Sequence, residues 1–114
     1  MIEITNNLGL ITISNDTLII IIKTVVADIE KVKITSNIAE EAIAVLGLTN
    51  GPIKIADKNF RPEITIILSA EFNTQLAEKG KEIQTKVASV INKLTTVEVD
   101  TINIIFKSLH QEEI

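Results

Sequence analysis

His110 is the only histidine in the chain, and histidine is the side chain best suited to proton transfer near neutral pH. A catalytic histidine needs a nucleophile and an orienting acid close to it. The sequence offers His110 neither, because Glu112 and Glu113 follow it in a short polar segment. We therefore expect His110 to belong to a solvated, flexible tail.

The serines and carboxylates give no catalytic pattern either. No serine lies in a Gly-x-Ser-x-Gly nucleophile elbow, and Ser14 and Ser36 stand where helix N-caps are expected. Glu78 and Glu82 are one helical turn apart, but the lysines around them indicate a solvated face of mixed charge. An acid–base pair would need burial to separate its two pKa values. The sequence therefore predicts no enzyme and no catalytic residue.

Cofactor and metal sites also lack a motif. The chain has no cysteine, which excludes disulfides and thiolate ligands. Its four glycines form neither a Walker loop nor a Gly-x-Gly-x-x-Gly turn. Asp57-Lys58-Asn59 is more simply a turn than a loop of metal-binding oxygens. We expect no cofactor and no metal ion.

Composition bears on the class of partner. A net charge of −4 and only three aromatic residues disfavour nucleic acid, which calls for cationic and stacking surfaces. The longest strongly apolar run is Leu18–Ile22, whereas a spanning helix needs ~20 residues. No signal peptide is visible at the polar N-terminus. We expect a cytoplasmic protein with no membrane span of its own.

Hydrophobic periodicity predicts the elements in the order β-α-β-α-β-β-α-β. The expected strands are Leu10–Ser14, Val32–Thr35, Ile53–Asp57, a strand from Arg61 to Phe72, and Ile102–Lys107, with Ile2–Thr5 as an additional weak strand. The expected helices are Asp16–Lys31, Ile38–Leu46 and Thr74–Leu94.

These elements predict one α+β domain over residues 1–114, with residues 1–8 and 110–114 as flexible ends. The helices and strands each have one apolar face. We therefore expect a two-layer sandwich in which the helices pack on one face of a mainly antiparallel sheet.

The other face of that sheet is the first candidate interaction surface. Alternation places five apolar side chains of one strand, from Ile64 to Phe72, on the covered face, and intervening side chains on the opposite face. The candidate residues on this opposite face are Thr65, Ile67, Ser69, Asn103, Ile105 and Lys107. Two interpretations remain open: the surface is an interface, or the segment Met1–Thr5 covers it.

The second candidate surface lies on the first helix. Its apolar face centres on Leu18 and Ile22, and Ile20, Lys23 and Ala27 fall outside that face. An exposed isoleucine among lysines is a candidate contact point for a protein partner.

Two segments carry a resemblance to a known family. Gly9-Leu10-Ile11-Thr12-Ile13-Ser14 runs into an amphipathic helix that reaches Val32. Near the other end, Ile83-Gln84-Thr85-Lys86-Val87, Thr95-Thr96-Val97-Glu98-Val99 and Ile102-Asn103-Ile104 follow in order. These patterns resemble the opening and closing segments of the alkaline-shock (YloU-like) family, a bacterial envelope-stress group found mainly in Gram-positive organisms. The middle, Ile53–Phe72, looks like the family's central strand pair.

The chain departs from the family pattern at two glycine positions. Lys31 stands where the family usually has glycine before the valine that ends its first helix. Thr96 stands where it usually has glycine after the threonine that ends its last helix. The expected helix Ile38–Leu46 also replaces a loop that is often rich in glycine.

The resemblance implies a non-enzymatic cytoplasmic protein with a role in envelope stress. Some family members associate with the membrane through a membrane-anchored partner, so we expect a protein partner of that kind or a second copy of the chain. The family carries no established catalytic residues. Two alternatives stay open: a KH-like nucleic-acid-binding module, and a small enzyme or apolar-ligand carrier with a pocket between helices and sheet.

Overall fold

The computed structural model describes residues 2–34, 51–58 and 61–111. Its strands and helices are β1 (Ile2–Asn6), β2 (Gly9–Ile13), α1 (Asn15–Ala27), β3 (Val32–Ile34), β4 (Ile53–Lys58), β5 (Arg61–Glu71), α3 (Leu76–Thr95) and β6 (Thr101–His110). The predicted helix Ile38–Leu46, its cap Ser36 and the predicted turn residue Asn59 lie outside the described residues. The α+β class is confirmed, and the weak strand at the N-terminus is a strand, β1.

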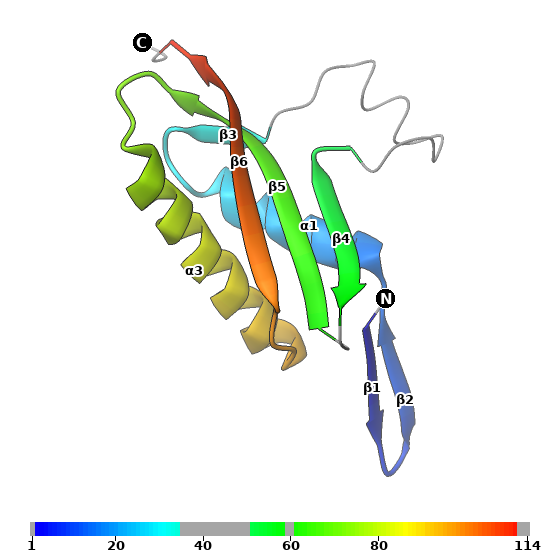
Figure 1. Ribbon diagram of the computed structural model, residues 1–114. Coiled ribbons are helices and arrows are strands. Elements are labelled where there is room, and N and C mark those ends of the chain that lie inside the picture. Colours follow the sequence, from blue (N-terminus) through cyan, green and yellow to red (C-terminus); the bar gives the residue numbers. More distant parts are fainter. Residues whose placement is uncertain (1, 35–50, 59–60, 112–114) are drawn as a thin grey trace.

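Strand β5 is the centre of the main sheet (Figure 1). β6 pairs with it in parallel along nearly its whole length. β4 and β3 both pair with it antiparallel, β4 with its first half and β3 with residues 68–70. Because a strand has two edges, β4 and β3 lie end to end along the edge opposite β6. β1 and β2 form a separate antiparallel hairpin.

The parallel pairing of β5 with β6 is the exception in a mainly antiparallel architecture. Parallel neighbours need a crossover of a dozen or more residues, usually a helix. Helix α3 lies between the two strands in the chain and supplies that crossover.

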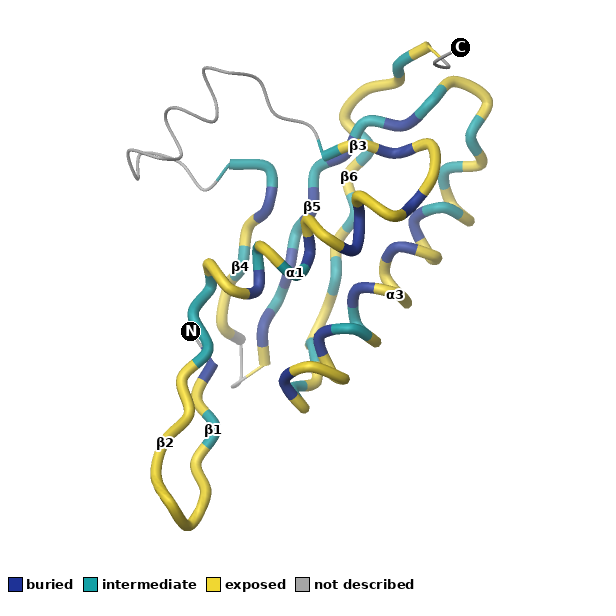
Figure 2. Tube along the Cα trace, turned by 180° about the vertical axis from the view of Figure 1, so that it is seen from behind, coloured by how far each residue is buried: buried dark blue, intermediate teal, exposed yellow. Residues whose placement is uncertain are grey.

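The core lies between the sheet and the two helices. Along β5, Ile64, Ile66 and Leu68 are fully buried and the residues between them are only half-buried, as the alternation predicted. α1 and α3 cover this face, and their buried stripes meet the strand residues there (Figure 2). The two-layer arrangement is therefore present. Phe72, expected on the covered face, is instead 64% exposed, because β5 ends at Glu71 and the chain turns before α3.

Helix α1 begins as the sequence indicates and ends earlier. The backbone N–H of Thr17 donates to Ser14 Oγ at 3.2 Å, which confirms Ser14 as the N-cap. The helix stops at Ala27, one turn before the predicted end at Lys31. Lys31 has a φ of 73°, in the left-handed region, so the chain reverses direction there and enters β3.

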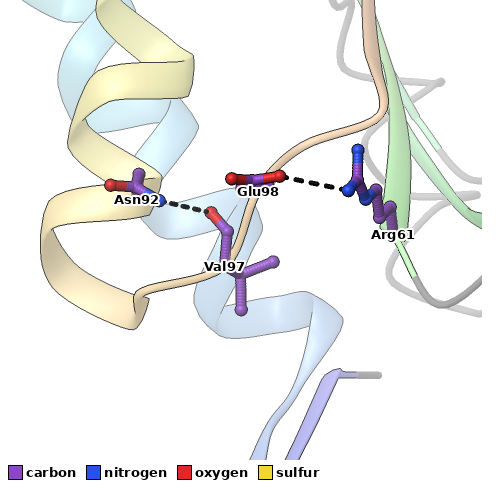
Figure 3. A network of polar contacts seen from close by, with 4 residues as sticks. All are labelled: Arg61, Asn92, Val97 and Glu98. Carbon is purple, nitrogen blue, oxygen red and sulfur yellow. Dashed lines mark hydrogen bonds and ion pairs between the residues drawn. The ribbon is translucent and has the colours of Figure 1, made fainter.

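Helix α3 also ends at a left-handed residue, Thr96, with a φ of 61°. Both positions where glycine was expected from the family pattern thus have the backbone conformation that glycine adopts with least strain. The following loop is held by polar contacts (Figure 3). The Asn92 amide donates to the Val97 carbonyl oxygen at 3.4 Å, and Arg61 pairs with Glu98 at 3.2 Å. The ion pair is largely exposed, so it contributes at most about 1 kcal/mol.

The outer edge of β6 is partly occupied by a side chain of α3. No strand of the described residues pairs with this edge. The side-chain amide of Gln84 donates to the Ile102 carbonyl oxygen at 2.8 Å, as a neighbouring strand would.

The β1–β2 hairpin extends away from the main sheet (Figure 1). Its turn is closed by the Leu8 backbone N–H, which donates to Asn6 Oδ1 at 2.8 Å. Only its root packs on the core: Ile2 is buried, and Ile4 and Ile13 are partly buried against the core.

Truncation of a buried side chain in β5 is predicted to lower the stability of the fold strongly. Leu68→Ala should lower the free energy of unfolding by about 2–5 kcal/mol, because it leaves a cavity at a fully buried site. Leu94→Ala makes the same chemical change at a side chain that is 64% exposed. It should change the free energy of unfolding by about 0.5 kcal/mol or less. Urea unfolding followed by circular dichroism measures both. Similar losses for the two variants would contradict this placement of the core.

Substitution of glycine at a left-handed residue is predicted to stabilise the fold. Lys31→Gly should raise the free energy of unfolding by about 0.5–1 kcal/mol, because relief of backbone strain exceeds the added entropy of the unfolded chain. Lys93→Gly, the same change inside α3, should lower it by about 1 kcal/mol. Equal destabilisation by both glycines would contradict the strain at Lys31.

Candidate functional site

The structure brings the predicted sheet residues together on the uncovered face of β5 and β6. We call this surface the open face: the register places Thr65, Ile67, Ser69, Asn103 and Ile105 on it, and the predicted residue Lys107 follows Phe106 at the edge of this group without a partner in the register. Thr65 lies directly opposite Asn103, and Ile67 directly opposite Ile105. The two isoleucines therefore form an apolar pair at the centre of the face, with polar side chains beside them.

No described element covers the open face. Ile105 is 47% exposed and Ile67 is half-buried. The N-terminal segment that could have covered them is engaged elsewhere, because Ile2–Asn6 pairs with Gly9–Ile13 in the hairpin. The interpretation that the N-terminal segment covers the open face is therefore wrong for its described residues, 2–5.

Charges of both signs lie around the open face. On the edge formed by β4 and β3, Lys54 lies opposite Thr65 and Lys33 opposite Ser69. On β5 itself, Glu63 accepts a 3.4 Å hydrogen bond from the Asn103 amide. An apolar centre with a polar rim is the usual anatomy of a protein–protein interface.

A β-bulge changes which residues of β6 reach this face. The register places Phe106 opposite Leu68 but Ser108 opposite Ser69, so Lys107 is the extra residue. Simple alternation from Ile105 would place His110 on the helix-covered face. After the bulge His110 instead shares the open side with Ser69.

His110 is thus an ordered strand residue and not part of a frayed tail. It is the last residue of β6, and its Nδ1 lies 2.6 Å from Ser69 Oγ. Its backbone carbonyl accepts a 2.8 Å hydrogen bond from the Phe72 N–H. The described residues show no carboxylate hydrogen-bonded to the imidazole, so the orienting acid of a catalytic triad is missing there. The contact fastens the end of β6 to β5.

Beside this contact lies a shallow hollow of about 400 Å³. Its lining residues are Phe72, Asn73, Leu109, His110 and Gln111. Phe72 and Leu109 are both more than half exposed, so this end of the sheet also presents apolar side chains to solvent.

The second predicted surface is also assembled, on the opposite side of the molecule. Leu18, Ile22 and Val26 of α1 face the core. Ile20, Lys23 and Ala27 lie together on the other side of the helix, where Ile20 is 65% exposed. The structure does not join this patch to the open face, because the helix layer and the sheet separate them.

The acidic residues of α3 lie as expected for a solvated face. Lys79 Nζ pairs with Glu82 Oε2 at 2.9 Å. Across residues 2–34, 51–58 and 61–111, no group of three or more histidine, aspartate or glutamate side chains could hold a metal ion. No helix among the same residues is both long and apolar enough to cross a membrane.

Comparison with family models, curated proteins and solved structures found no match for this chain. The resemblance to the alkaline-shock family stays a prediction.

The serine–histidine contact predicts a local effect of mutation. Ser69→Ala should speed hydrogen exchange at the Phe72 amide, because the strand end that accepts its hydrogen bond loses a side-chain anchor. Amides in the middle of α1 should keep their rates, and Ser89→Ala on the exposed side of α3 should change neither region. Unaltered exchange at Phe72 in Ser69→Ala would show that the contact does not hold this end of the sheet.

Proposed function

We propose that this protein is a non-catalytic protein-interaction module of the alkaline-shock (YloU-like) type. The observation that carries the proposal is the apolar pair Ile67 and Ile105 at the centre of a sheet face that no described element covers. Antiparallel sheets can leave one face in water, but that face is then usually polar. Two isoleucines in register at its centre favour contact with another protein surface.

The backbone at two positions supports the family assignment. Lys31 and Thr96 stand where the family pattern has glycine, and both are left-handed. A glycine at such a site has a physical reason, since it adopts positive φ with little strain. The two left-handed turns are therefore compatible with the family pattern, although other residues stand at both positions.

The proposed role is in the envelope-stress response, in the cytoplasm. The module acts by association, either with further copies of itself or with a membrane-anchored protein that holds it near the membrane. The second surface, around Ile20 on α1, is free to bind at the same time because it lies on the opposite side of the fold.

This proposal predicts that a charge in the centre of the open face abolishes association. Ile67→Asp places a carboxylate where an apolar contact forms, and burying an unpaired charge is strongly unfavourable. Pull-down from the native host should lose its partner protein, and any self-association should shift to monomer in size-exclusion chromatography with light scattering.

A matched aspartate controls for the added charge. Thr85→Asp lies on the exposed side of α3, and it should retain every partner of the wild type. Circular dichroism of Ile67→Asp checks that the fold is intact. A folded Ile67→Asp that keeps the same partners and the same oligomeric state would refute the proposed interface.

A further inference from the structure

The β1–β2 hairpin is an apolar arm whose outer part no other described element covers. Leu8 at its turn is 99% exposed, Leu10 is 57% exposed and Ile11 is 50% exposed. In Figure 2 the whole outer part of the hairpin is exposed. Neither β1 nor β2 makes an extensive contact with another described element.

Such an arm is expected to need a partner. An isolated two-stranded hairpin is at best marginally stable in water, and a third strand or a packed face is needed for independent stability. Here Ile2 is buried, and Ile4 and Ile13 are partly buried against the core, while the rest of the hairpin is exposed. Ile4 and Ile11 lie opposite each other on the same face as the anchored pair Ile2 and Ile13. The apolar stripe of the root therefore continues outward into solvent.

We infer that this hairpin is an exchange arm: in a two-fold dimer, the arm of each copy lies on the open face of the other. Ile11, with the part of Ile4 that the core leaves exposed, then packs against the pair Ile67 and Ile105. This inference rests on the proposed function, and it specifies the partner of the open face as a second copy of the same chain.

The buried area favours exchange between two copies. Leu10 lies on the opposite face of the arm, across from Thr5, so the apolar surface offered to the partner comes from Leu8 at the turn and from Ile11, roughly 250 Å² together. A stable interface buries at least about 600 Å² on each partner. One arm docked on one open face falls short of that value. In a reciprocal dimer each copy contributes both an arm and an open face, which roughly doubles the area.

Symmetry also favours a reciprocal dimer over one-way docking. A two-fold arrangement covers both arms and both faces, whereas one-way docking leaves an arm exposed at one end and a face at the other. The arm carries one charged side chain, Glu3, on the face away from Ile4 and Ile11. The contact is therefore apolar, and the dimer should persist when salt is raised.

The first experiment compares association constants by sedimentation velocity on the full chain. Ile11→Thr keeps strand propensity and removes the apolar contact, and should weaken dimerisation at least about tenfold. Leu10→Thr makes a similar change at an exposed side chain on the other face of the arm, and should leave dimerisation unchanged. A dimer that dissociates in high salt would indicate a charged interface and overturn the inference.

The second experiment tests which surface receives the arm. The chain has no cysteine, so Ile11→Cys copies can be mixed with Ile105→Cys copies and oxidised without competing thiols. A disulfide between residues 11 and 105 of different copies is expected, since its formation requires the two Cβ atoms to approach to about 4 Å. Absence of this cross-link in a sample that dimerises would overturn the inference.

The outcomes separate this inference from the proposed function. If Ile67→Asp blocks association but Ile11→Thr does not, the open face is an interface and the arm does not occupy it. If the wild type is monomeric at all concentrations, the exchange dimer is refuted, while loss of another protein partner in Ile67→Asp would still uphold the function.

Discussion

The burial of alternate residues along β5 is the constraint on which the rest of the structure depends. Its inward side chains are completely enclosed, and its two edges are shared among three strands. A one-residue slip of this strand would exchange its apolar and polar faces. Burial therefore fixes the register of β5, and β5 in turn positions β3, β4 and β6.

The open face follows from that arrangement. α3 must connect two parallel neighbours, and it does so across the same face of the sheet that α1 covers. Both described helices lie on that side, and no described element covers the other side of β5 and β6. The uncovered isoleucine pair is thus a product of topology as well as of sequence.

Local chemistry was predictable from the sequence, and long-range pairing was not. The alternation in β5 and the cap at Ser14 depend on neighbours in the chain, so both were predicted. The bulge at Lys107 depends on the register between β6 and β5, which no local pattern records. For this reason His110 was assigned to the tail, although it contacts Ser69 across the two strands. Phe72 was likewise misplaced, because alternation does not reveal where a strand ends.

The hydrogen bond from Gln84 to the Ile102 carbonyl has a consequence for aggregation through the edge of the sheet. An uncovered sheet margin can template the addition of strand after strand, which leads to fibrous aggregates. A glutamine amide seated on one carbonyl interrupts the regular row of acceptors that such growth needs. The described part of the molecule can therefore present an apolar arm and an uncovered sheet face for selective contacts, while one carbonyl on the outer edge of β6 is closed to an added strand.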